Sequence, residues 1–562
     1  MSAFAILGAA GAPGDRPLST TTELRQINVI PRPARVEPAA GEFILRPKTA
    51  IFVTSDSAEL KRAAEYLHGL LAPATGRSLP VANNPANERA KGIVLSMTDA
   101  DAALGDEGYE ILVTPENALL RAPTPAGIFY AVQTLRQLLP TEIESARRPR
   151  GVKWSIPCLR IIDKPACAWR GFMLDCSRHF MSKEYIKRTI DLLAFHKLNV
   201  LHWHFIDSNG WRMQVDSYPK LTQIGAWRGK AARRYGGFYT KDDIREIVAH
   251  AKSRHVMIVP EFEMPGHSDA ALACYPELSC SGESYKLPAE PLPNENLNYF
   301  TKLNSSRPFC AGKDEVFKFH EAVFNEAVEL FDSPYVHVGG DERPKGVWEK
   351  CPKCQARMKA EGLKDEHDLQ NWFMRRISDI LARKGKRVIS WAVTRSDPYH
   401  PTDMDDLGNN AIIQNWHDGT AFAAGKGWDV VNAHNGFVYF DYPEFKGMNK
   451  PKWMPLLPLE KVYSFEPTPA ALNTTEAKHI LGGEACLWTE LVPQDKVDAQ
   501  IFPRLLALAE AVWSPREGKD YADFARRVAR HEARLARMGV KYGKPPLCAV
   551  GVIGDHAHNE DR

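Results

Sequence analysis

Hydrophobic and polar positions follow one pattern in the first part of the 562-residue chain and a different one in the rest. From residue 28 to 150, short β-branched runs alternate with stretches of helical spacing, the clearest of which has apolar residues at Ile128, Val132 and Leu135. These patterns predict a small α/β domain. The polar, proline-containing stretch 141–157 is typical of a linker.

After residue 166 the pattern is a hydrophobic run typical of a strand, followed by a stretch with helical spacing, and this unit repeats along the chain. One helical pattern opens with Thr240 and Asp243, which are spaced as a capping box. Eight such units favour a (β/α)8 TIM barrel, since doubly wound sheets usually use fewer strands. We therefore predict a barrel over 166–540 that ends in a helix packed on it. Its strands are expected at 169–175, 198–205, 255–263, 335–342, 387–393, 411–416, 436–441 and 480–488.

The composition is that of a globular protein with little net charge. Lysine and arginine number 72 against 69 aspartate and glutamate, a net charge of +3, so no nucleic acid or anionic membrane surface is expected as a partner. No apolar run reaches the roughly 18 residues of a membrane span. Residues 1–27 read as a leader and 541–562 as a tail. The apolar start of the leader favours a secreted or periplasmic protein, although it lacks a basic first segment.

Ten cysteines permit disulfides without requiring them. Cys351 and Cys354 form a C-x-x-C pair, and no second pair follows at zinc-finger spacing. The sequence therefore favours a coincidental or structural pair over a zinc site. We predict no metal and no cofactor.

Residues with catalytic chemistry follow the predicted strands, where a barrel places its active site. The fourth strand ends in two glycines, Asp341 and Glu342. Alone, this stretch could be a turn with Asp341 as a helix cap. The other strand ends favour a site, since they contribute acids, histidines, an arginine and aromatic residues: Asp175, Arg178, His179, His202, His204, Asp207, Glu261, Glu263, His267, Trp391, Trp416, Tyr439, Asp441 and Trp488.

Two chemistries fit such a set. Histidines and carboxylates could bind a metal for hydrolysis, but no helical H-x-x-x-H pair is present. Tryptophans favour a sugar, with a carboxylic acid protonating the leaving oxygen. Acids adjacent in sequence are poor candidates to flank one glycosidic bond, so Asp341 and Glu342 leave two possibilities. Either a distant acid is the nucleophile, or the substrate supplies its own.

Five segments, WRGFMLDCSRHF, KLNVLHWHFID, PEFEMPGH, VHVGGDE and GGEACLWTE, occur in an order that resembles the β-N-acetylhexosaminidases of glycoside hydrolase family 20. The resemblance covers nearly the whole chain and implies an N-terminal α/β domain before the catalytic barrel. It implies that Glu342 is the general acid/base and that Asp341 orients the 2-acetamido group of the substrate. In that family the acetamido oxygen attacks the anomeric carbon and forms an oxazolinium intermediate.

The resemblance also implies roles for the other site residues. Tyr439 resembles a hydroxyl donor to the acetamido group, and Asp207 with His267 resembles a pair that supports Glu342. The remaining residues resemble an aromatic box and clamps on the sugar hydroxyls: Trp391, Trp416 and Trp488, and Arg178, Asp441 and Glu490. Cys280 and Cys310 flank an insert at 283–307, and related enzymes suggest a disulfide between them.

The implied activity is that of a retaining exo-β-N-acetylhexosaminidase. It would release terminal N-acetylglucosamine or N-acetylgalactosamine from glycans or chitin oligomers, as a monomer or homodimer. Two alternatives remain open at this point. One is a relative that releases a disaccharide such as lacto-N-biose, and the other is a glycan-binding barrel without catalysis.

Overall fold

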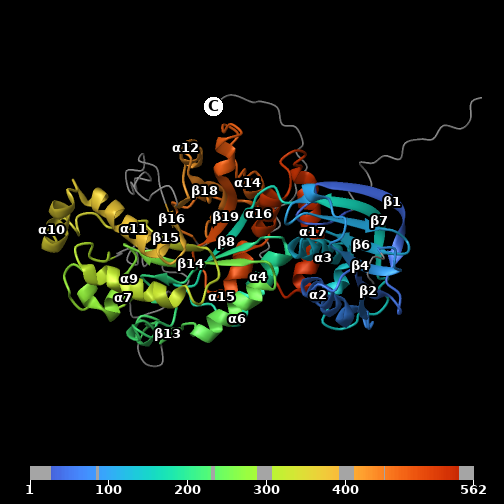
Figure 1. The fold of residues 1–562 in the computed structure, drawn as a ribbon, viewed down its shortest axis with the longest axis horizontal. Coiled ribbons are helices and arrows are strands. Elements are labelled where there is room, and N and C mark those ends of the chain that lie inside the picture. Colours follow the sequence, from blue (N-terminus) through green and yellow to red (C-terminus); the bar gives the residue numbers. More distant parts are fainter. Residues whose placement is uncertain are drawn as a thin grey trace, which may run out of the picture.

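A mixed α/β sheet domain and a closed barrel lie side by side in the computed structural model of the chain, with helix α17 (Tyr521–Arg537) at their junction (Figure 1). The predicted leader and tail lie almost wholly outside the described residues. Within the described part, no helix is long and apolar enough to cross a membrane. The structure describes residues 27–83, 88–229, 234–287, 307–391, 411–448 and 450–542.

The N-terminal domain is a seven-stranded mixed sheet in the order β1-β7-β5-β6-β4-β2-β3, packed against two helices. Ser57 caps the first of these helices, and Thr124 caps the second just before a proline at its first position. The elements are β1 (Arg35–Ile44), β2 (Ala50–Val53), α2 (Ala58–Thr75), β3 (Val81–Asn83), β4 (Gly92–Ser96), η1 (Ala102–Leu104), β5 (Tyr109–Val113), β6 (Ala118–Arg121), α3 (Pro125–Leu138), η2 (Thr141–Glu144) and β7 (Ser155–Asp163).

The predicted linker at 141–157 is wrong in its last three residues. Strand β7 begins at Ser155 and pairs antiparallel with both β1 and β5, so this sheet continues past residue 150 to Asp163. This strand was not predicted because Pro157 lies within it, and proline is unusual in the interior of a strand. Here Pro157 faces Glu42 beside a register shift in β1, a place where the ladder tolerates it.

The predicted barrel is confirmed: eight strands close in parallel pairing. Thr240 and Asp243 form the predicted capping box. The barrel strands are β8 (Trp169–Asp175), β9 (Val200–His204), β14 (Met257–Met264), β15 (Tyr335–Gly339), β16 (Arg387–Trp391), β17 (Ile412–Asn415), β18 (Asp429–Asn432) and β19 (Ile480–Leu487). Helices that follow the barrel strands include α4 (Lys183–Phe195), α6 (Lys241–Lys252), α9 (Asp314–Ala327), α11 (Glu366–Ala382), α12 (Thr420–Gly425) and α16 (Arg504–Trp513).

Short elements occupy the connections between these units. They are β10 (Ile206–Asp207), β11 (Gly210–Trp211), α5 (Lys220–Gln223), β12 (Trp227–Arg228), β13 (Tyr235–Gly236), α7 (Asp269–Cys274), η4 (Pro276–Leu278), α10 (Pro352–Glu361), α13 (Asn435–Val438), α14 (Leu459–Tyr463), η6 (Glu476–His479) and α15 (Gln494–Ile501).

One predicted barrel strand, at 436–441, is wrong. That stretch begins inside the short helix α13, whose first turn is capped by the His434 side chain. The seventh barrel strand is instead β18, at 429–432, which pairs with β17 and β19. Its two valines are too few to give a clear period, whereas the aromatic residues at 437–440 have strand propensity although they form no barrel strand.

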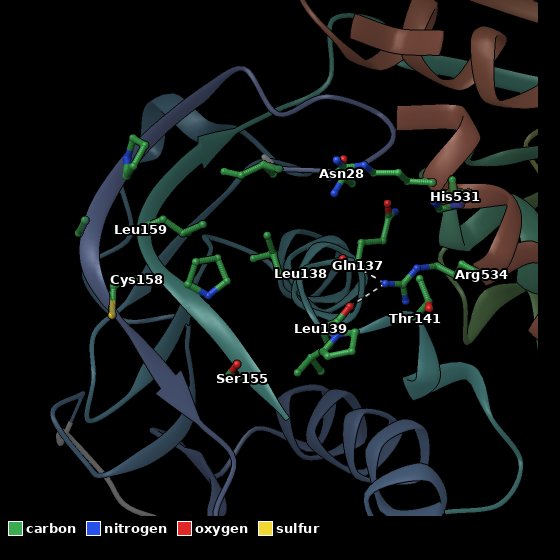
Figure 2. A pocket seen from close by; sticks show the side chains of 16 residues that line it. Asn28, Gln137, Leu138, Leu139, Thr141, Ser155, Cys158, Leu159, His531 and Arg534 are labelled. Carbon is green, nitrogen blue, oxygen red and sulfur yellow. Dashed lines mark hydrogen bonds between the residues drawn. The ribbon is translucent and has the colours of Figure 1, made fainter. Parts of the chain in front are cut away.

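The two domains are joined by helix α17 and by buried ion pairs. Arg534 of α17 donates to the backbone oxygens of Gln137 and Leu139, as Figure 2 shows, beside a cavity of about 510 Å³. Lys197 of the barrel pairs with Asp163 of the sheet at 3.0 Å, and both side chains are fully buried. Because such charges are costly to leave unpaired, these contacts fix how the domains meet. The final helix thus packs on both domains, not on the barrel alone.

Candidate active site

A pocket of about 400 Å³ opens at the carboxyl ends of the barrel strands. Every residue to which the resemblance gives a role in the site lines this pocket except Asp207, which lies directly behind His267. The predicted residues on its wall are Arg178, His267, Asp341, Glu342, Trp391, Trp416, Tyr439, Asp441, Trp488 and Glu490.

The backbone after β15 brings the two adjacent acids to the same pocket. The strand ends at Gly339, and Gly339 and Gly340 have φ angles of 65° and 109°. Glu342 itself has a φ of 41°, a left-handed conformation that non-glycine residues rarely adopt. Alternation along a strand would have separated Asp341 from Glu342, but this turn removes that constraint. Backbone strain of this kind is often found at functional sites.

Gly339 also allows the close approach of a buried carboxyl group. A Cβ at this position would overlap the carboxylate of Glu263, which comes from β14 and accepts a hydrogen bond from the Gly340 amide at 3.2 Å. Burial, followed by the neighbouring Asp341, raises the pKa of Glu263 well above its usual value. This shift favours the neutral form of Glu263, and its contact with the Gly340 amide holds the loop that carries Asp341.

We expect Gly339→Ala to lower kcat by tens of fold, since displacing a catalytic group by about 1 Å can cost roughly 10²-fold. Gly362→Ala is the matched control. Gly362 has a similar φ of 69°, but a Cβ there meets no atom within 4 Å. Both variants should lose about 1–2 kcal/mol from the left-handed conformation, and only Gly339→Ala should lose activity. Equal activities in the two variants would contradict this account of the turn.

A hydrogen-bonded chain runs from Asp207 through His267 to Glu342. His267 Nδ1 lies 3.3 Å from Asp207 Oδ1, and His267 Nε2 lies 3.3 Å from Glu342 Oε2. Burial alone would lower the pKa of His267, but Asp207 and the catalytic acids outweigh it and raise that pKa well above the usual value. This shift favours the imidazolium form, which can donate toward both carboxylates.

Asp207→Asn should lower kcat by about 10–100-fold, as loss of an outer-shell orienting carboxylate typically does. Without Asp207, burial would dominate and the pKa of His267 would fall, so the imidazolium would lose its proton at lower pH than in wild type. We therefore expect the alkaline limb of kcat/KM to move toward lower pH. The matched control is Asp191→Asn, because Asp191 also pairs with a histidine and an arginine, His250 and Arg254, but outside the site. Parallel pH profiles for wild type and Asp207→Asn would rule out this role.

Aromatic rings form the walls around the acids. Trp416 and Tyr439 lie nearly parallel, at an interplanar angle of 4° and a centroid distance of 6.4 Å. Trp391 and Trp488 lie 5.8 Å apart, and the Trp391 ring is fixed by a 2.7 Å hydrogen bond from Nε1 to Glu261. Burial raises the pKa of Tyr439 well above 10, so its hydroxyl is a neutral donor. Such a box suits an apolar group that also carries a hydrogen-bond acceptor.

Charged groups gather at another part of the wall. Arg178 lies 2.9 Å from Asp207 and 3.9 Å from Glu490, with its guanidinium 5.1 Å from the centre of the Trp488 ring. Burial, and then Glu490, raises the pKa of Asp441 to about 7. Oδ1 of Asp441 is buried and has no hydrogen-bond partner among the described residues. The geometry leaves this carboxyl group available for a polar ligand.

Glu261 is the centre of a buried polar network below the pocket. It accepts from Trp391 and lies at hydrogen-bond distance from His202, His204 and His337. The sequence placed Glu261, His202 and His204 at strand ends, but the structure uses them as support and not as pocket lining.

Several lining residues were not predicted. They come from the segment after β17 and from the long connection before β19, and they are His417, Asn435, Tyr442, Trp453 and Met454. Trp453 is the most informative, since 61% of it is exposed although it is a large apolar residue. A tryptophan with a proline close on either side, in the stretch PKWMP, was the only sequence signal for it.

Comparison with known proteins settles the family. Residues 167–516 match the model described as glycosyl hydrolase family 20, catalytic domain, and residues 26–164 match domain 2 of the same family. The chain belongs to glycoside hydrolase family 20. It is a glycoside hydrolase of the β-hexosaminidase type, as the resemblance had implied.

Relatives in family 20 span most of the chain. A β-hexosaminidase of Porphyromonas gingivalis is 36% identical over 525 residues, which cover 92% of this chain and 64% of that longer protein. A β-hexosaminidase of Akkermansia muciniphila is 34% identical and covers 79% of this chain and 87% of its own length.

Solved structures of family 20 share the fold. The β-N-acetylhexosaminidase of Streptomyces coelicolor A3(2) has a TM-score of 0.78 and 34% identity, over 92% of this chain and 98% of that one. A mutant Streptomyces plicatus β-hexosaminidase in complex with its product, GlcNAc, has a TM-score of 0.77 and 32% identity, over 92% of this chain and 97% of that one.

Proposed function

We propose that the protein is a retaining exo-β-N-acetylhexosaminidase in which the acetamido group of the substrate is the nucleophile. The observation that supports this most is the turn after β15, which directs two adjacent acids into one aromatic-walled pocket. Acids so close in sequence cannot easily take opposite faces of a sugar ring. A substrate that brings its own nucleophile needs only one of them as the proton donor.

In the proposed first step, Glu342 donates a proton to the glycosidic oxygen while the acetamido carbonyl oxygen attacks the anomeric carbon. The bond to the leaving group breaks, and positive charge develops on the acetamido nitrogen. Asp341 accepts a hydrogen bond from that N–H and stabilises the charge, and Tyr439 donates to the carbonyl oxygen to hold it in line. His267 keeps the acidic side chain of Glu342 oriented through the 3.3 Å contact.

In the second step a water molecule attacks the anomeric carbon from the side that the leaving group vacated. Glu342, now a carboxylate, accepts the proton of that water. The bond from the acetamido oxygen to the anomeric carbon breaks, which restores the amide. Two inversions give net retention of the β configuration, and the enzyme returns to its starting protonation state.

The pocket size supports action at a chain end. A volume of about 400 Å³ is near the lower end of the range for small-ligand sites, which suits one terminal sugar. Arg178, Asp441 and Glu490 would bind its hydroxyls. The natural substrates would then be glycans or chitin oligomers with terminal N-acetylglucosamine or N-acetylgalactosamine.

Nitrophenyl β-glycosides test this proposal directly. We expect hydrolysis of the N-acetylglucosaminide or the N-acetylgalactosaminide, a β-configured product by NMR at early times, and little activity on the β-glucoside, which lacks the acetamido group. Inactivity on both N-acetylated monosaccharides would contradict the proposal. If only a disaccharide glycoside such as the lacto-N-bioside were cleaved, the disaccharide-releasing alternative would replace it, and sugar binding without turnover would indicate a glycan-binding barrel.

A further inference from the structure

Four cysteines that lie far apart in the sequence meet on the outer side of the barrel. Cys351 and Cys354, the lone C-x-x-C of the sequence, are joined by Cys280 and Cys310. The sequence alone favoured a coincidental or structural pair because no second pair follows nearby, whereas in the structure a second pair comes from the two cysteines that flank the 283–307 insert. The interior of that insert lies largely outside the described residues.

The spacing of the four sulfur atoms is that of a tetrahedral metal site. The Sγ atom of Cys310 lies 3.7 Å from that of Cys351 and 3.6 Å from that of Cys354, and the Sγ atoms of Cys280 and Cys354 lie 3.9 Å apart. All four lie within 4.8 Å of one another. Zinc–sulfur bonds of about 2.3 Å in a tetrahedron give sulfur–sulfur edges of about 3.8 Å. The disulfide expected between Cys280 and Cys310 is not formed, since both cysteines are free.

The backbone is built to bring these sulfurs together. Cys351 directly precedes helix α10, and Cys354 lies in its first turn after Pro352. Gly312 lies so close to this turn that a Cβ would overlap the backbone of Lys353 and come within 2.5 Å of the Cys354 nitrogen. On the other side, the Cys310 amide donates to the Leu278 oxygen at 2.9 Å, and Ser279 and Phe309 form a β-bridge. Two loops and a helix start are thus fixed around one point.

The surroundings suit a site that is closed to substrate. Cys310 and Cys354 are fully buried, Cys351 is 5% exposed, and Cys280 is half-buried. Four thiolates around a divalent ion carry a net charge of −2, which favours cations nearby. Arg343 lies close enough to interact with Cys354 electrostatically, and Lys313 donates to the backbone oxygens of Glu277 and Ser279 beside Cys280.

We propose that Cys280, Cys310, Cys351 and Cys354 bind one Zn²⁺ ion with a structural role. Four protein ligands leave no open position, so the ion takes no part in hydrolysis. It joins the base of the insert after β14 to the start of α10, and the chain runs directly from Glu342 through Arg343 to that helix. The ion therefore fixes the far end of the loop that carries the catalytic acid. This inference does not depend on the proposed glycosidase mechanism.

Metal analysis of the full chain, purified without a metal-affinity step, tests the site. We expect about one zinc per chain in wild type, in line with one tetrahedral site of four cysteines. Cys354→Ser should lose the zinc, and Cys158→Ser, which changes a buried cysteine in β7 of the N-terminal domain, should keep it. Wild type with less than a tenth of that content, or with iron in place of zinc, would overturn the assignment.

The oxidation state of the four sulfurs gives a second, independent measurement. After unfolding with a chelator present, alkylation and peptide mapping should find all four cysteines as free thiols. A disulfide between any two of them would overturn the proposal, because a covalent cross-link and not a metal ion would then join these segments. Zinc removal should also lower Tm in wild type and leave the Tm of Cys354→Ser unchanged. A chelator effect of equal size in both would place the metal elsewhere.

Discussion

Replacing Glu342 by glutamine is expected to lower kcat/KM by about 10²–10⁴-fold on a substrate whose leaving group is another sugar, the usual contribution of general acid–base catalysis. Glutamine keeps the shape of the side chain and its contact with His267 but cannot donate the proton. A sugar alkoxide is a poor leaving group, so the first step would lose most of its assistance. Steady-state kinetics on an N-acetylated disaccharide measure this loss.

The loss in Glu342→Gln should depend on the leaving group. Nitrophenolate leaves without much protonation, so the first step should be far less impaired on the nitrophenyl substrate than on the disaccharide. The matched control is Glu349→Gln, an exposed glutamate on the same loop but outside the pocket, which should behave as wild type. If Glu342→Gln lost activity equally on both substrates in the bond-breaking step, another residue would be the acid.

Asp341→Asn should lower kcat by about 10²–10³-fold, the loss typical of removing one preorganised electrostatic contact to a transition state. Burial raises the pKa of Asp341, opposed by the nearby His267, whose Nε2 lies 3.9 Å from its carboxylate. When the acetamido nitrogen gains positive charge, a carboxylate stabilises it and a neutral amide does not. The effect belongs to the transition state, so KM should change much less than kcat.

Thermal unfolding is the control for Asp341→Asn. Asparagine has the same shape, so Tm should stay close to that of wild type. A variant with unchanged kcat and a raised KM would contradict this account, because the role of Asp341 would then be substrate binding alone. A large fall in Tm would instead show that its contact with Glu263 is mainly structural.

The sequence predicted the barrel and most of its site for a physical reason. Each parallel strand is a continuous apolar run, and the residues that follow it must face the same mouth. Arg178, His267, Asp341 and Trp488 were found because each follows such a run directly. The same reasoning failed for β18, whose apolar core of two valines is too short to give a period.

Other features could not be predicted because they depend on contacts between distant segments. Glu263 was expected as a strand-end acid, but its position beneath Gly339 is determined only by the packing of β14 against β15. Trp453 reaches the pocket from an irregular connection without periodicity. Likewise, Cys280 and Cys310 lie near Cys354 only in the folded chain, so neither spacing nor composition indicates a four-cysteine cluster.

The central claim is that the acetamido oxygen of the substrate attacks the anomeric carbon while Asp341 accepts a hydrogen bond from the acetamido N–H. It is tested most directly by measuring kcat/KM for nitrophenyl glucosaminides whose N-acyl group carries none, one, two or three fluorine atoms. Fluorine withdraws electrons from the carbonyl oxygen and weakens it as a nucleophile. We predict a steep, progressive fall in kcat/KM along the series. A flat series, together with a sugar covalently bound to a side chain of the enzyme, would contradict the account.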